Sequence, residues 1–282
     1  MPHPVIFDRR LLRARLARAA AIGPATFLLD SVADDIAERL SAVLRTFDTA
    51  VDLGTPTAAV RRAIAERVGT VAAVVADEEA LPFRDASLDL VVSALTLQHV
   101  NDLPGTLIQI RRALKPDGLF LAAMIGGESL AELRAAFAEA EAEVEGGVSP
   151  RVAPFADLRD LGALLQRAGF ALPVTDVDRI TVRYASPLAL MHDLRRMGAG
   201  NVLAERRRLP LRRATLRRLL EIYAERFADP DGRIRATFEI VWLSGWAPHE
   251  SQQKPLRPGS AQTRLADALR AQEISAGEKA GR

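Results

Sequence analysis

The spacing of hydrophobic positions changes from helical to strand-like near residue 47. Segments 8–21 and 26–46 repeat apolar residues at intervals of about three and four, which predicts two helices. Short apolar or β-branched runs then predict strands at 49–54, 70–76, 88–95, 119–125, 175–184 and 234–246. Helical patterns at 57–68, 102–114, 128–145, 157–168, 187–197 and 212–227 separate these strands. Lys115, Pro116, Asp117 and Gly118 predict a turn before the fourth strand.

Alternating strands and helices predict a three-layer α/β fold with a doubly wound parallel sheet, whose ligand lies beyond the carboxyl ends of the strands. The predicted organisation is an N-terminal helical segment (1–46), a core (47–184), a helical insert (185–233), a final core strand (234–250) and a loosely ordered tail (251–282). The insert precedes the final strand, and we expect it to cover the strand ends.

The connection after the first strand is short. Only residues 55–69 separate it from the next strand, whereas a helix, a strand and a second helix need about 40 residues. The sequence therefore predicts a sheet that lacks one strand–helix unit. Because a right-handed crossover places strand 70–76 beside the first strand, Asp77 or Glu78 would reach the position of a ribose-binding acid. A simple solvated loop is the alternative.

Composition narrows the class of protein. The 282 residues are 49% hydrophobic and 26% charged, as in globular proteins. No apolar run approaches the ~20 residues of a membrane-spanning helix. The absence of cysteine excludes disulfides, thiolate metal sites and cysteine nucleophiles, and it fits a reducing cytoplasm. The net charge is +2, and the arginine clusters contain no interleaved aromatic residues, so we expect no nucleic-acid partner.

Few side chains suggest acid–base or metal chemistry. None of the four histidines has another at ligand spacing, so no metal site is predicted. Gln98 and His99 follow the strand 88–95, and Tyr184 and His249 could cap the same cleft beyond the strand ends from the insert and the tail, so these four are the catalytic candidates. Their alternative role is that of ordinary satisfied polar groups.

Four motifs resemble the class I S-adenosylmethionine-dependent methyltransferases. They are Val51-Asp52-Leu53-Gly54, Leu81-Pro82-Phe83 with Ser87 to Ser93, Leu107 to Gly118, and Asp160 to Phe170. This resemblance implies a Rossmann-like methyltransferase fold and the cofactor S-adenosylmethionine. It also implies that Asp52, Gly54, Asp77 and Glu78 bind the cofactor, with Leu95 against the adenine.

More specific motifs resemble the complex I assembly factor 5 family, which is described as arginine hydroxylases. They include Ile6-Phe7-Asp8-Arg9, Ala76-Asp77-Glu78-Glu79, Val100-Asn101-Asp102, Glu145-Gly146-Gly147, Met197-Gly198 with Asn201, and His249-Glu250-Ser251-Gln252. The resemblance implies a protein substrate, a complex I subunit, and modification of arginine. Because the match begins at Ile6, no transit peptide is expected, which favours a bacterial cytoplasmic protein, with a peripheral position at the inner membrane left open.

The loop after Gly54 departs from the methyltransferase pattern. Thr55, Pro56 and Thr57 stand where further small residues would let the backbone approach the cofactor. Pro56 also lacks an N–H and suits the first position of a helix. The sequence thus leaves three functions open: an enzyme acting on a protein, a non-catalytic assembly protein that has lost the cofactor, and a malonyl-acyl-carrier-protein O-methyltransferase.

Overall fold

The computed structural model describes residues 5–74, 77–154, 157–253, 260, 263 and 265–272. The chain divides into two compact units, Met1–Pro248 and His249–Arg282. The first unit contains the sheet and the sites discussed below. In the second unit, the described residues include one short helix, α9 (Leu265–Leu269). Among the described residues, no helix is both long enough and apolar enough to span a bilayer.

One mixed sheet forms the centre of the first unit. In the described residues it has six strands in the order β2-β1-β3-β4-β6-β5. The strands are β1 (Phe47–Leu53), β2 (Val68–Val74), β3 (Leu88–Ala94), β4 (Leu114–Ile125), β5 (Ala171–Tyr184) and β6 (Ile234–Trp246). β1 to β4 are parallel, whereas β6 is antiparallel to both β4 and β5. Every predicted strand is therefore present.

The connection between β1 and β3 is shortened as predicted. In the described chain it contains the helix α3 (Ala59–Ile64), a 3-10 turn (Ala65–Arg67) and β2, which pairs in parallel with β1. The predicted helix 57–68 is thus shorter, and Pro56 lies before its N-cap at Ala58 rather than at the first helical position. The carboxyl ends of β1 and β2 lie side by side.

Two predicted boundaries were wrong because distant residues decide them. α2 (Phe27–Ser41) ends five residues before the expected position 46. Arg67 Nη2 donates to the carbonyls of Leu40 at 2.9 Å and Val43 at 2.6 Å, which satisfies the free end of the helix. The predicted turn at 115–118 lies inside β4, since Asp117 N donates to Ala247 O at 3.0 Å and extends the pairing with the end of β6.

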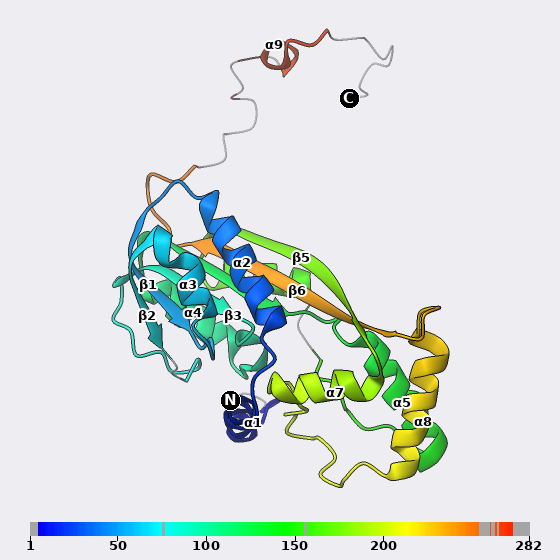
Figure 1. Ribbon diagram of the computed structural model, residues 1–282. Coiled ribbons are helices and arrows are strands. Elements are labelled where there is room, and N and C mark those ends of the chain that lie inside the picture. Colours follow the sequence, from blue (N-terminus) through cyan, green and yellow to red (C-terminus); the bar gives the residue numbers. More distant parts are fainter. Residues whose placement is uncertain are drawn as a thin grey trace, which may run out of the picture. The chain divides into compact units, whose positions relative to one another are not determined.

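Helices cover both faces of the sheet. α2 and α3 pack on one face, where their apolar residues join Ala50, Leu90 and Trp242 in one core. Figure 1 shows α2 lying across the sheet on this face. α4 (Leu103–Ala113) and α6 (Leu158–Arg167) pack on the other face, against Val51 and Phe120. This arrangement is the predicted three-layer fold.

The antiparallel pair β5 and β6 extends past the end of β4, and a helical lobe packs on this extension. Ile125 at the end of β4 pairs with Ile240, whereas β6 pairs with β5 as far as Ile234. α5 (Ala131–Glu145), α7 (Pro187–Arg196) and α8 (Arg213–Phe227) gather around this extension (Figure 1). The predicted insert therefore lies beyond the carboxyl end of β4, with α1 (Arg9–Ala21) against α7.

Some arginines in and before the basic helix α8 pair with acidic residues of α5. Arg218 Nε lies 2.6 Å from Glu143 Oε2, and Arg207 and Arg226 form ion pairs with Glu145 and Glu139. The arginine run at 206–208, 212–213 and 217–218 is predicted from the sequence to face solvent or a partner. Arg208, Arg212, Arg213 and Arg217 are indeed exposed, whereas the acidic face of α5 binds Arg207 and Arg218.

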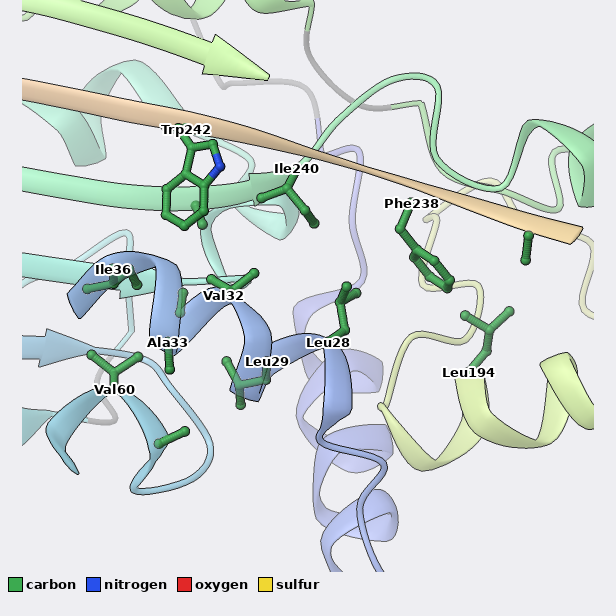
Figure 2. Close-up of a cluster of buried hydrophobic side chains, with 14 of the residues drawn as sticks. Leu28, Leu29, Val32, Ala33, Ile36, Val60, Leu194, Phe238, Ile240 and Trp242 are labelled. Atoms are coloured by element: carbon green, nitrogen blue, oxygen red, sulfur yellow. The ribbon is translucent and has the colours of Figure 1, made fainter. Parts of the chain in front are cut away.

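The contribution of α2 packing to stability can be measured at Ile36. Figure 2 shows Ile36 and Val32 on the side of α2 that lies toward Trp242, and Ile36 is fully buried. We expect Ile36→Ala to lower the free energy of unfolding by about 2–4 kcal/mol, because the change leaves a cavity. The control Leu44→Ala, at a fully exposed leucine, should change it by less than about 0.5 kcal/mol. Urea unfolding measures both, and equal losses would contradict the packing of α2.

Candidate functional site

A tight turn follows β1 at the carboxyl edge of the sheet. Gly54 has φ +81°, a backbone conformation that favours glycine, and its N–H donates to Val74 O at 3.0 Å. A Cβ atom at this position would lie 3.0 Å from Glu78 Oε1 and 3.2 Å from Thr96 Oγ1. Glycine therefore leaves a narrow space between a carboxylate and a hydroxyl, which a ligand can approach along the backbone.

Asp52 lies two residues before this turn and is 1% exposed. Neither of its carboxylate oxygens has a hydrogen-bond partner in the described part of the chain, and the same is true of the buried Thr55 hydroxyl. Burial raises the pKa of Asp52, and the neighbouring Thr55 and Arg61 offset part of that effect. A buried carboxylate without a partner is unfavourable, so this side chain is suited to a cationic ligand.

The acidic loop after β2 is held by an arginine of the N-terminal helix. Arg9 Nη2 lies 3.0 Å from Asp77 Oδ1 and also contacts Glu78 Oε2, while Arg9 Nη1 lies 3.3 Å from Glu79 Oε1. Glu79 Oε1 also accepts a hydrogen bond from Asn101 N at 2.6 Å. The loop is thus fixed by ion pairs rather than simply solvated, and Glu78 lies beside Gly54.

Leu95, Gln98 and His99 follow β3 on the same edge of the sheet. Leu95 has φ +55°, and its carbonyl accepts from Gln98 Nε2 at 2.6 Å. The His99 ring meets the Phe7 ring edge-on, with centroids 5.5 Å apart. Burial, together with the nearby Arg9, lowers the pKa of His99 to about 4. His99 is therefore neutral at pH 7.

Tyr184 is not brought to this group, and His249 lies in the other compact unit. Tyr184 pairs with Ile234 at the far end of the β5 and β6 pair, inside the helical lobe, and burial raises its pKa to about 12, with Asp193 adding to the effect. His249 belongs to the second unit, where its Nδ1 lies 2.7 Å from Ser251 Oγ. The two stay untested catalytic candidates, as do Gln98 and His99.

Sequence reasoning did not identify Arg9 and Thr96 as site residues. Thr96 Oγ1 lies 2.7 Å from Ser93 Oγ and donates to Leu53 O at 3.3 Å, so it holds the β1 turn against β3. Three consecutive acids at 77–79 were a usable signal, because such a loop needs a nearby cation to relieve the repulsion among its charges. The sequence did not show which of the many arginines supplies it.

The residues present suit S-adenosylmethionine better than a metal ion. Asp52 offers an unpaired buried carboxylate for a cationic group, and Gly54 offers a space that a Cβ would fill. A cavity of about 460 Å³ also lies beside the acidic loop, but it is lined by Phe7, Arg9 and Asn101 among others and not by Asp52, Gly54 or Glu78, so it is not counted as the cofactor site. No group of three histidine or acidic residues among those described is arranged to hold a metal ion.

Comparisons with known proteins agree with this architecture. Residues 36–122 match the methyltransferase domain family. The BH2331 protein of Bacillus halodurans C-125, a proposed methyltransferase, superposes with a TM-score of 0.51 at 17% identity, over 76% of this chain and all of that chain. This likeness shows the fold alone.

Two groups of curated proteins are similar in sequence. The arginine-hydroxylase NDUFAF5 of Danio rerio mitochondria is 38% identical over 93% of this chain and 89% of its own length. A malonyl-[acyl-carrier protein] O-methyltransferase of Gallionella capsiferriformans is 40% identical over 62% of this chain and 58% of its own length. Because the likeness to the first group extends over nearly the whole of both chains, the protein belongs to the NDUFAF5 arginine-hydroxylase family, within the methyltransferase fold.

Proposed function

We propose that this protein binds S-adenosylmethionine at the carboxyl ends of β1 and β2 and acts on a protein substrate. The buried, unpaired carboxylate of Asp52, two residues before the Gly54 turn, carries the proposal. S-Adenosylmethionine contains an ammonium group, also present in S-adenosylhomocysteine, which would compensate this negative charge. A charge-assisted hydrogen bond in a buried site is among the stronger polar contacts that proteins make.

The neighbouring residues suit the rest of the cofactor. Glu78 Oε1 lies toward the Gly54 turn, where it would accept hydrogen bonds from the ribose hydroxyls. Asp77 is directed instead to Arg9 and Arg13, so we assign it no direct contact with the ribose. The partly buried Leu95, at the end of β3, would pack against the adenine.

The substrate assignment rests on kinship. The NDUFAF5 relatives are arginine hydroxylases, and we propose a protein arginine, on a subunit of respiratory complex I, as the group modified here. S-Adenosylmethionine would supply an electrophilic methyl group, whereas the hydroxylation named for the relatives would also need an oxidant. Methyl transfer depends mainly on alignment of acceptor and methyl carbon, so a neutral His99 is compatible with it. Mass spectrometry of complex I subunits, from cells with and without the protein, would detect the modified arginine.

Calorimetry and thermal melts with S-adenosylhomocysteine test the cofactor site. Saturation at about 100 times the dissociation constant adds ~2.7 kcal/mol and raises the melting temperature by several degrees. We expect binding to the wild-type protein. Absence of heat and of a shift at millimolar ligand would contradict the proposal and favour a non-catalytic assembly protein, the function suggested by Pro56 in the loop.

Gly54→Ala and Gly146→Ala form a matched pair for the same test. Both glycines have positive φ, but a Cβ at Gly146 meets nothing within 4 Å. Each change should therefore cost about 1 kcal/mol of stability from backbone strain. Only Gly54→Ala should weaken binding of S-adenosylhomocysteine, by about tenfold or more, because its methyl group fills the space beside Glu78. Equal affinities of the two variants, measured by calorimetry, would exclude close approach of the ligand at Gly54.

A malonyl-acyl-carrier-protein methyltransferase is less well supported. Its recognition of an acidic carrier would need a free basic surface, and the arginine run of the insert was the candidate for it. Arg207 and Arg218 of this run are paired with α5, which leaves Arg208, Arg212, Arg213 and Arg217 exposed. The match to that enzyme, however, covers a smaller part of both chains.

A further inference from the structure

The two carboxylate oxygens of Glu78 lie in different surroundings. Oε2 contacts the Arg9 guanidinium, whereas Oε1 lies 3.0 Å from the position that a Cβ on Gly54 would occupy. The Glu78 backbone is fixed separately, because its carbonyl accepts from Thr106 Oγ1 of α4 at 3.0 Å. Backbone and carboxylate are therefore both held, and one oxygen is left facing the turn after β1.

A cation is needed for this orientation because three consecutive residues of the loop are acidic. Without one, repulsion from Asp77 and Glu79 favours turning Glu78 outward into water. Arg9 contacts all three acids and its side chain is only 13% exposed, so its charge is poorly screened. Arg13 contacts Asp77 alone, at 2.9 Å, and its side chain is 61% exposed.

Hydrogen bonds fix the N-terminal segment in place, so the position of Arg9 relative to the acidic loop is also fixed. Asn101 Oδ1 accepts from Ile6 N and Phe7 N, both at 2.8 Å, and Asp8 N donates to Val202 O at 2.8 Å. Arg9 is the first residue of α1, and the Asp8 side chain caps that helix by accepting from Leu11 N at 2.9 Å. The guanidinium is thus preorganised for its contacts.

We propose that Arg9 is a positioning residue of the cofactor site, which orients Glu78 so that Oε1 accepts hydrogen bonds from the ribose hydroxyls of S-adenosylmethionine. This inference rests on the proposed function. It makes the N-terminal segment a part of the cofactor site, although no residue of that segment touches the ligand. Arg9 acts only through Glu78.

The test is the ratio of dissociation constants for S-adenosylhomocysteine and its analogue lacking the ribose hydroxyls, measured by calorimetry. In the wild-type protein we expect the analogue to bind about 10–100 times more weakly, the usual effect of leaving a buried polar group unpaired. Arg9→Gln should weaken S-adenosylhomocysteine by the same factor of about 10–100, leave the analogue nearly unaffected, and so bring the ratio close to one. Arg13→Gln removes the same charge from the same helix and should leave the ratio unchanged.

Glu78→Gln is a second variant that removes the same contact without changing the N-terminal segment, in case Arg9→Gln disturbs that segment. It should lower the ratio in the same way, and the double variant should be no worse than either single variant, since both act on one contact. Additive effects, or a wild-type ratio retained in Arg9→Gln, would show that Arg9 is merely structural. No binding by the wild-type protein would overturn the proposed function as well, whereas a wild-type ratio of one would overturn only the role of the ribose hydroxyls.

Discussion

Asp52→Asn should weaken binding of S-adenosylhomocysteine strongly while making the ligand-free protein more stable. The loss of a charge-assisted contact in a buried site corresponds to a dissociation constant about 100 times larger. The gain in stability at pH 7, of order 1 kcal/mol, follows because the unpaired buried charge disappears while the shape of the side chain stays the same. Calorimetry measures the first effect, and urea unfolding measures the second.

The pH dependence of this stability has a definite sign. The pKa of Asp52 is raised in the folded state by burial, so the folded protein binds a proton more readily than the unfolded chain does. Lowering the pH through the folded pKa therefore removes the destabilising charge, and the advantage of Asp52→Asn should shrink. A variant that binds normally, or that is less stable than wild type at pH 7, would contradict the account of Asp52 as an unpaired ligand-binding acid.

Glu141→Ala should cause a large loss of stability, about 3–5 kcal/mol. Glu141 is fully buried in α5 and accepts hydrogen bonds from Ser149 N at 2.7 Å and Arg151 Nε at 2.7 Å. Its removal leaves the guanidinium of Arg151, which is only 15% exposed, without its carboxylate. Urea unfolding at pH 7 measures the loss.

Glu143→Ala on the same helix is the matched control. Glu143 is 46% exposed and pairs with Arg218 at the surface, so its removal should cost less than about 1 kcal/mol. Burial tends to raise the pKa of Glu141, but hydrogen bonds from Ser149 and Arg151 outweigh it and lower that pKa. The stabilisation by Glu141 is thus present at neutral pH and lost in acid as the pH falls through the folded pKa. Similar losses for the two variants would show that Glu141 does not anchor the segment around Ser149.

Local sequence patterns were sufficient to predict the strands, since each is a run of β-branched, apolar or alternating residues. The short connection after β1 likewise revealed the missing strand–helix unit by its length. The prediction of a parallel sheet was wrong for β6, which is antiparallel to β4 and β5, because strand direction depends on the long insert before β6. The boundaries that failed depend on remote partners. Arg67 caps the C-terminal end of α2, and the hydrogen bond from Asp117 to Ala247 extends the pairing of β4. Neither contact can be predicted from the residues near it in the sequence.

The candidate site was predictable only in part for the same reason. Asp52, Gly54 and Glu78 were identified from motif and topology, and the structure brings the turn and the loop together. Arg9 lies about seventy residues from its acids in the sequence, and dozens of arginines and lysines compete for the role. Charge balance required a cation at the loop but could not select which one.

The hydrogen bonds of the N-terminal segment also set an order for folding. Asp8 N donates to Val202 O and Ala204 N donates to Ile6 O, so residues 6–8, which are synthesised before the strands of the sheet, have partners almost 200 residues further along the chain. Contacts of such long sequence separation form late in folding, because closing a long loop costs conformational entropy before the contact stabilises the chain. During synthesis the strands β1 to β4 can be complete while residues 6–8 still lack these partners, so the nascent sheet precedes the finished site.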